Sequence, residues 1–172
     1  YTDITERKER ERELERNEQI IQEMNDGVVV VQDGIITYTN PQVSEMTGYS
    51  AEELQDTPMS EFIAPEDREL VYHRYQERVA GNDPPSTYEI GVVPKDGETI
   101  PVEITASRVE YAGEPATVSI VRDIADRKQR ERELERQNER LDEFASVISH
   151  DLRNPLNVAE LRLELAHEEC DS

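Results

Sequence analysis

Short apolar runs with a period of two alternate with turn residues through the middle of the chain. The runs at 27–31 and 35–39 flank Asp33-Gly34, a dipeptide typical of a two-residue hairpin turn. Three later runs of the same kind predict three further strands, at 88–92, 100–104 and 118–120. The pattern therefore predicts five strands, two in the first part of this region and three in the last.

Helical patterns lie between the second and the third of these strands. Ser50 is followed three residues later by Glu53, which is the spacing of a helix capping box. A longer helix is predicted after Pro65 and runs toward Gly81. This order predicts an α+β fold, in which one five-stranded antiparallel sheet is covered by helices on one face.

A segment rich in Glu and Arg at 3–16 recurs almost unchanged at 123–136. Opposite charges lie four residues apart in both copies, which predicts two solvated helices. Copies separated by a whole domain indicate a connector that follows each domain of one kind. We therefore expect a connector helix at 1–26 from an absent upstream domain, a compact domain at 27–124, and a long helix at 125–172.

The helix predicted at 125–172 carries a seam of apolar residues. They follow the three- and four-residue spacing of a coiled-coil contact, at Leu134, Leu141, Ala145, Ile148 and Leu152. His150 lies two residues beyond Ile148, about 200° around the helix, so it points away from the seam. We expect a parallel homodimer that displays His150, with Asp151 beside it and Asn154 one turn further on.

The segment FASVISHDLRNPL at 144–156 resembles the first helix of the dimerisation and phosphotransfer domain of sensor histidine kinases. The resemblance implies that His150 accepts a phosphoryl group, that Asp151 assists the transfer, and that Asn154 positions water during dephosphorylation. It also implies two partners, the receiver domain of a response regulator and an ATP-binding domain that holds ATP and Mg²⁺. All seven glycines lie at or before Gly113, so we expect this piece, which lacks a glycine-rich ATP-binding domain, to be inactive alone.

The compact domain resembles the PAS sensor domain in the order of its short motifs. The matching segments lie at 36–41, 46–54, 65–68, 95–97 and 123–124. The family's closing motif is usually Asp-Ile-Thr, and Ala125 stands here in place of the threonine. The resemblance implies a PAS fold at 27–124, and the spacing of Asp123 and Arg127 predicts an ion pair that joins the sheet to the outgoing helix in the signal relay.

The resemblance leaves the sensed signal open, because PAS domains hold haem, flavin, a small metabolite or nothing. A photosensing flavin domain needs a cysteine within the domain, and the single cysteine, Cys170, lies outside it. His73 is the only histidine at 27–124; we interpret it as a solvated surface residue, with a haem ligand as the alternative. No cofactor is evident, and we expect a small pocket that is empty or fitted to an unknown small molecule.

The chain carries 40 acidic and 19 basic residues, a formal net charge of −21. This balance argues against nucleic-acid binding, which requires a basic surface. Acidity spread along the chain indicates a halophilic protein, because high salt screens self-repulsion; an ordinary acidic protein is the alternative. No apolar run approaches the ~20 residues that span a bilayer, so we expect a cytoplasmic location.

Together these patterns predict the sensory and dimerisation part of a two-component histidine kinase, which relays a PAS-sensed signal along a coiled coil to His150. A non-catalytic PAS module for ligand binding and dimerisation is the alternative. A plain coiled-coil scaffold is disfavoured, because residues 27–124 carry too much strand pattern.

Overall fold

The computed structural model describes residues 2–170. Its helical elements are α1 (Thr2–Glu23), α2 (Pro41–Thr47), α3 (Ala51–Leu54), η1 (Met59–Phe62), η2 (Pro65–Asp67), α4 (Arg68–Val79) and α5 (Ala125–Cys170), of which η1 and η2 are short 3-10 turns. Its strands are β1 (Gly27–Gln32), β2 (Ile35–Thr39), β3 (Thr87–Val92), β4 (Ile100–Tyr111) and β5 (Glu114–Asp123). The chain divides into two compact units between Asp126 and Arg127.

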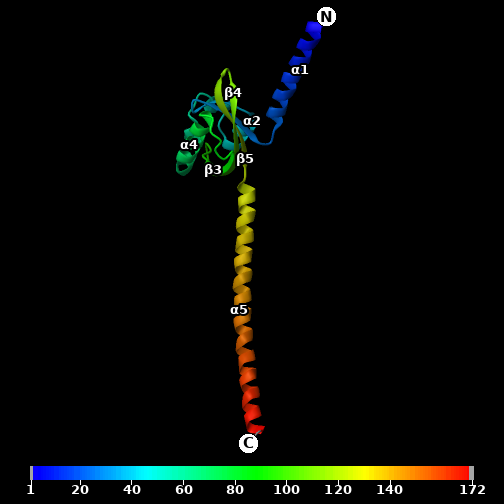
Figure 1. Ribbon diagram of the computed structural model, residues 1–172, viewed down its shortest axis with the longest axis vertical. Helices are drawn as coiled ribbons and strands as arrows, with labels where there is room; N and C mark the ends of the chain where they lie inside the picture. The colour runs from blue at the N-terminus through cyan, green and yellow to red at the C-terminus, as the bar shows by residue number, and fades with distance from the viewer. Residues whose placement is uncertain (1, 171–172) are drawn as a thin grey trace. The chain divides into compact units, whose positions relative to one another are not determined.

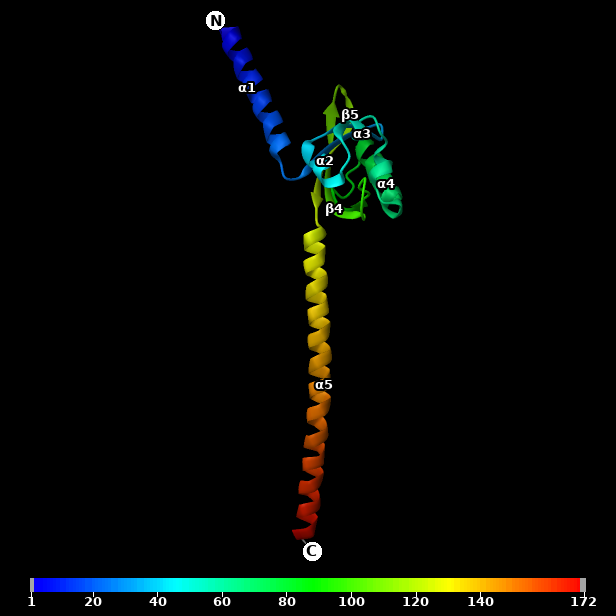
Figure 2. The same ribbon diagram turned by 180° about the vertical axis from the view of Figure 1, so that it is seen from behind.

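The five strands form one antiparallel sheet in the order β2-β1-β5-β4-β3. Figure 1 shows the domain that contains this sheet, with β3, β4 and β5 labelled. The first and the last strand in the chain pair at its centre, so the sheet is complete only when the whole domain is folded. The short helices and α4 lie between β2 and β3 in the chain and pack against the sheet, as the reverse view also shows (Figure 2). The predicted α+β fold class is therefore confirmed.

The hairpin predicted at Asp33-Gly34 is confirmed. The φ angles of Asp33 and Gly34 are 52° and 78°, and a two-residue turn between twisted strands needs two such positive values. Ala112 and Gly113 join β4 to β5 with φ angles of 51° and 80°. Both hairpins thus use a left-handed residue followed by glycine, the residue that adopts this conformation without strain.

The capping box predicted from Ser50 and Glu53 is also confirmed. The Oγ of Ser50 accepts a hydrogen bond from the backbone N–H of Glu53 at 3.2 Å, and the Oε2 of Glu53 accepts one from the backbone N–H of Ser50 at 2.9 Å. The Oε1 of Glu53 lies 2.6 Å from the Nζ of Lys95. This pair therefore connects the start of α3 to the loop between β3 and β4.

The core lies between the sheet and the helices. One cluster of buried side chains surrounds Val102 and includes Val71 from α4, and the other surrounds Leu54 and Phe62. Leu54 and Val102 are 1% and 0% exposed, so each is in contact with other atoms on every side.

Strands β4 and β5 are longer than the apolar alternation predicts. Strand β4 continues past Ile104 to Tyr111, because its polar second half stays paired with β5 in register. Strand β5 runs from Glu114 to Asp123, beyond both ends of the run predicted at 118–120, and Ile124, the predicted end of the domain, lies outside it. Ile124 is instead a buried link between strand and helix: it is 3% exposed, and its backbone N–H donates to the carbonyl of Pro101 at 3.0 Å.

Asn40 fastens the end of α1 to the sheet. Its Oδ1 accepts from the backbone N–H of Val28 at 2.9 Å, and its Nδ2 donates to the carbonyls of Ile21 and Asp26 at 3.0 Å and 3.1 Å. The side chain is 1% exposed, so losing these bonds would leave buried polar groups without partners.

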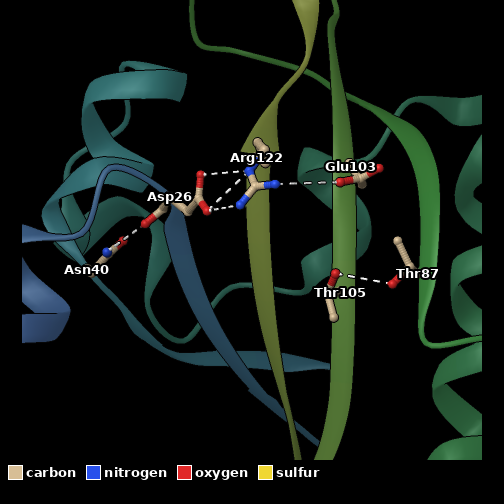
Figure 3. A network of polar contacts seen from close by, with 6 residues as sticks. All are labelled: Asp26, Asn40, Thr87, Glu103, Thr105 and Arg122. Atoms are coloured by element: carbon tan, nitrogen blue, oxygen red, sulfur yellow. Dashed lines mark hydrogen bonds and ion pairs between the residues drawn. The ribbon is translucent and has the colours of Figure 1, made fainter.

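Arg122, near the end of β5, lies between two carboxylates from distant parts of the chain (Figure 3). Its Nη2 lies 2.7 Å from the Oδ2 of Asp26, and its Nη1 lies 4.0 Å from the Oε1 of Glu103 on β4. The pKa of Arg122 is raised, first by the hydrogen bond to Asp26 and then by the charge of the same residue. The segment before β1 is thus joined to the strand that leads into α5.

Candidate functional site

An internal cavity of about 100 Å³ lies between the sheet and the helices. Most of its wall is apolar and comes from every strand and from α2, α3 and α4. On β5 the cavity-facing residues are Thr117, Ser119 and Val121, whereas Val118 and Ile120 face the other side of the sheet. The strand predicted at 118–120 is therefore correct, but its two defining apolar residues do not form the cavity side of the core.

Six polar side chains interrupt this apolar wall. Two of them, Arg78 and Thr117, are 5% and 3% exposed; the others belong to Thr47, Tyr75, Tyr88 and Ser119. The Oγ1 of Thr47 donates to the carbonyl of Val43 at 2.7 Å, and the hydroxyl of Tyr75 accepts from the backbone N–H of Gly34 at 3.0 Å. The Nη2 of Arg78 donates to the carbonyl of Pro85 at 3.0 Å. The Oγ1 of Thr117 is buried and has no hydrogen-bond partner among the described residues 2–170.

Tyr88 contacts two arginines of α4. Burial raises the pKa of its phenol, and the nearby charges of Arg78 and Arg74 oppose that rise only in part. The guanidinium carbon of Arg74 lies 4.3 Å from the centre of the Tyr88 ring, a cation–π distance. Tyr88 is therefore neutral at physiological pH and does not compensate the charge of Arg78.

The buried Arg78 is absent from the sequence-based predictions, although the sequence holds a signal for it. Val71, Tyr75 and Arg78 are spaced by four and three residues, which places them on one face of α4. All three line the cavity. A charged residue at the third position of an otherwise apolar stripe is the pattern that would have revealed it.

Neither residue considered for cofactor binding is among those that line the cavity. The side chain of His73 is 69% exposed on α4, and its Nε2 lies 4.0 Å from the Oε2 of Glu77, so its predicted surface position is confirmed. Cys170 is exposed at the end of α5. Among residues 2–170, no group of three His, Cys, Asp or Glu side chains is arranged to hold a metal ion.

His150 and Asp151 lie on α5 with 77% and 74% of their side chains exposed. The Nδ1 of His150 lies 3.7 Å from the Oδ1 of Asp151. An N–H at Nδ1 facing a carboxylate leaves Nε2 as the ring nitrogen with a free lone pair. The helix thus presents a histidine ring that can be reached from solvent.

Asn154 is four residues beyond His150, so the two lie one turn apart on the same face of α5. The helix continues through Pro155 to Cys170. No residue of α5 is buried, and its large apolar side chains, including Leu141, Ile148 and Leu152, are 38% to 66% exposed. The predicted seam is therefore without a partner within the described part of the chain.

Asp123 and Arg127, the two residues predicted to form the relay at the start of α5, each contact another residue. The Oδ1 of Asp123 accepts a hydrogen bond from the backbone N–H of Ala125 at 2.8 Å, which satisfies a donor in the first turn of the helix. The Nε of Arg127 lies 3.9 Å from the Oε1 of Glu131. The ion pair between Asp123 and Arg127 stays a prediction.

None of the helices within residues 2–170 combines the length and apolarity needed to cross a bilayer.

Comparisons with known proteins agree on the domain and its relatives. The model of the PAS fold family matches residues 15–124. Hybrid signal transduction histidine kinase B of Dictyostelium discoideum is 30% identical over 159 residues, covering 85% of this chain but only 8% of that protein. The chain thus spans a small part of this relative.

Two solved structures resemble the fold at 25% sequence identity. The PAS domain of an HTR-like protein from Haloarcula marismortui has a TM-score of 0.59, over 70% of this chain and 98% of that one. A sensory box histidine kinase/response regulator from Burkholderia thailandensis has a TM-score of 0.55, over 73% of this chain and 97% of that one. The family match over more than half of the chain, together with this fold, places the chain in the PAS fold family, with sensor histidine kinases among its relatives.

Proposed function

We propose that this chain is the sensory and dimerisation part of a two-component histidine kinase, in which a signal received by the PAS domain is relayed along α5 to His150. The observation that carries the proposal is the exposed pair of His150 and Asp151, with Asn154 one turn on, in a helix that begins directly after strand β5. The relationship to sensor histidine kinases supports the same assignment.

In the proposed reaction, Nε2 of His150 attacks the γ-phosphorus of ATP held by a separate ATP-binding domain. An N–P bond forms, the bond between the γ-phosphorus and its bridging oxygen breaks, and that electron pair leaves with ADP. The positive charge that develops on the imidazole is stabilised by Asp151, because its carboxylate oxygen Oδ1 lies 3.7 Å from Nδ1. His150 is the phosphoacceptor and Asp151 the group that assists the transfer.

Asn154 has a different proposed role. An uncharged amide on the same helix face can hold a water molecule through hydrogen bonds, but it cannot take a proton from the histidine. Its place beside His150 suits a water that attacks the phosphoaspartate of a docked response regulator. The receiver domain of that regulator is the second proposed partner.

The proposed assembly is a parallel homodimer through α5. Large apolar side chains spaced by three and four residues are exposed on this helix, and pairing with a second copy would remove them from water. His150 lies about 200° around the helix from Ile148 and would stay accessible in such a dimer. Asp123 and Arg127, at the junction with the sheet, would hold the helix to the strand that moves it.

Phosphate labelling of the intact parent protein tests the phosphoacceptor. His150→Gln should abolish acid-labile phosphate after incubation with radiolabelled ATP, since the nucleophilic nitrogen is lost. His167→Gln, on the same helix, is the matched control and should label normally. Persistent labelling of the His150→Gln protein would rule out the assignment.

Separate assays of labelling and regulator dephosphorylation test the division of roles. Asn154→Ala should leave labelling of His150 largely unchanged and slow the loss of phosphate from the regulator. Equal loss of both activities would contradict a specific role of Asn154 in dephosphorylation.

A non-catalytic module for ligand binding and dimerisation is the second candidate, and the internal cavity favours it. The labelling experiment distinguishes the two candidates. A parent protein that never carries phosphate on His150, although its ATP-binding domain is intact, would favour the non-catalytic module.

A further inference from the structure

A buried arginine, Arg78, lines the cavity of the PAS domain, and no carboxylate within the described residues neutralises its charge. Arg78 is 5% exposed, and no carboxylate within residues 2–170 forms an ion pair with it. Its neighbours are the carbonyl of Pro85, which is a neutral acceptor, and the neutral phenol of Tyr88. A buried guanidinium is normally paired with an anion, because removing the charge from water is costly.

A second polar group faces the same cavity without a partner. The Oγ1 of Thr117 makes no hydrogen bond within the described residues, although Thr117 is 3% exposed. Buried hydroxyls without partners are uncommon in folded proteins, and such a group indicates a missing ligand or water. Arg78 and Thr117 come from different elements, so the two observations are independent.

The register of the sheet brings both groups to one end of the cavity. The carbonyl of Ser86, the residue after Pro85, accepts a hydrogen bond from the backbone N–H of Ala106 at 2.8 Å. Ala106 is paired with Ser119 on β5, two residues from Thr117 on the same face of the strand. Arg78 and Ala106 also line a surface pocket next to this end of the cavity, through which a ligand could enter.

The rest of the wall sets the size and the polarity of the ligand. It is built from residues such as Leu54, Phe62, Ile90 and Val92, which offer no hydrogen bonds. A volume of about 100 Å³ is somewhat smaller than the ~150 Å³ of an apolar cavity that holds benzene. The ligand therefore has a short apolar body of a few carbons and one anionic end.

We infer that the cavity binds a short-chain monocarboxylate, whose carboxylate pairs with Arg78 and accepts a hydrogen bond from Thr117 while its alkyl chain fills the apolar part. A planar carboxylate matches the fork of guanidinium N–H groups. This inference rests on the proposed function, because it names the chemical class of the signal that the PAS domain receives.

Calorimetric titration of the 172-residue chain with butanoate tests the inference. Butanamide has the same shape without the charge, and acetate has the charge without the longer chain. Butanoate should bind at least about tenfold more tightly than either control, since both the ion pair and the buried alkyl chain contribute. Butanoate that binds no more tightly than butanamide, or does not bind, would overturn the inference.

Variants assign the interaction to its residues. Arg78→Gln should lower butanoate affinity about tenfold and remove the preference over butanamide, whereas Arg7→Gln, which removes a charge on α1 whose side chain is 83% exposed, should change neither. Thr117→Val keeps the shape of the side chain and should lower butanoate affinity about two- to tenfold. Unchanged affinity in Arg78→Gln would mean that Arg78 only anchors the loop at Pro85.

If Arg78→Gln does not fold, as judged by circular dichroism, Thr117→Val decides the question. Unchanged affinity in that variant would overturn the inference. The labelling of His150 is measured without butanoate or acetate. A failure of the cavity to bind butanoate is therefore distinguishable from a failure of His150 to accept phosphate.

Discussion

The PAS domain and residues 127–170 of α5 differ in where their apolar side chains go. In the domain, side chains such as Leu54 and Val102 are buried among residues of the same chain. On α5 no residue is buried, and Leu141 and Leu152 are 62% and 58% exposed. The domain holds within itself the contacts that stabilise it, whereas the apolar side chains of the helix have no such contacts within the described residues, as the proposed dimerisation through α5 would lead us to expect.

Salt has the largest expected effect, because both regions share an excess of 21 negative charges. Self-repulsion extends over a Debye length of ~10 Å at 0.1 M salt and only ~3 Å at 1 M. We predict that the native circular dichroism signal is lost at low salt and restored along a potassium chloride series. A full native signal and an unchanged Tm at low salt would contradict a halophilic protein.

The next largest effect is expected from shortening a buried side chain, which should destabilise the PAS domain much more than the same change on α5. Leu54→Ala removes an almost wholly buried side chain and should lower the free energy of unfolding of the PAS domain by about 2–5 kcal/mol. Leu134→Ala, at a side chain that is 60% exposed, should change it by less than about 0.5 kcal/mol. Chemical unfolding of both variants measures the two free energies of unfolding. Equal losses would contradict the difference between the buried side chains of the domain and the exposed ones of the helix.

A truncation on the seam should affect association and not the fold. Leu141→Ala removes two apolar side chains per dimer and should raise the dissociation constant at least about tenfold. Glu143→Ala, about 200° around the helix from Leu141, is the matched control and should leave the constant unchanged. Sedimentation equilibrium measures both, and a monomeric wild-type chain would contradict the proposed dimer.

The smallest expected effect belongs to the exposed pair of Glu53 and Lys95. The pKa of Glu53 is lowered, first by the hydrogen bond from Lys95, so the pair stabilises the domain at neutral pH and this contribution is lost as the pH falls through the folded pKa. Glu53→Gln should therefore lower the Tm slightly at neutral pH and not in acid. Glu52→Gln removes the same charge beside it and should have no such pH-dependent effect.

Local patterns predicted much of this fold. The turn at Asp33-Gly34 and the capping box of Ser50 and Glu53 follow from backbone conformation and hydrogen bonding among neighbouring residues, so a short segment contains all the information. The polar second half of β4 escaped detection, because pairing with β5 and not apolar alternation holds it in the sheet.

In the candidate site too, the sequence predicted the arrangement of neighbouring residues but not the contacts between distant segments. His150, Asp151 and Asn154 lie within one turn of a helix, so their spacing alone places them together, although their roles stay predictions. Contacts between distant segments left no local pattern: Asp26 and Arg122 meet only through the pairing of β1 with β5. The boundaries at 1–26, 27–124 and 125–172 also stay predictions.

The central claim is that the self-contained domain controls the exposed helix through a rigid connection. Regulation of the parent kinase after insertions between Arg136 and Gln137 tests it most directly, with butanoate as the probe added to the PAS domain. One or two extra residues rotate the helix beyond them by about 100° or 200°, and seven add about two full turns.

We predict that the short insertions invert or abolish regulation of His150 phosphorylation and that the seven-residue insertion largely restores it. Should butanoate itself have no effect on the parent, the basal rate of labelling in the same series gives the readout. Phosphorylation of His150 that is indifferent to the length of the insertion would contradict a rigid helical relay.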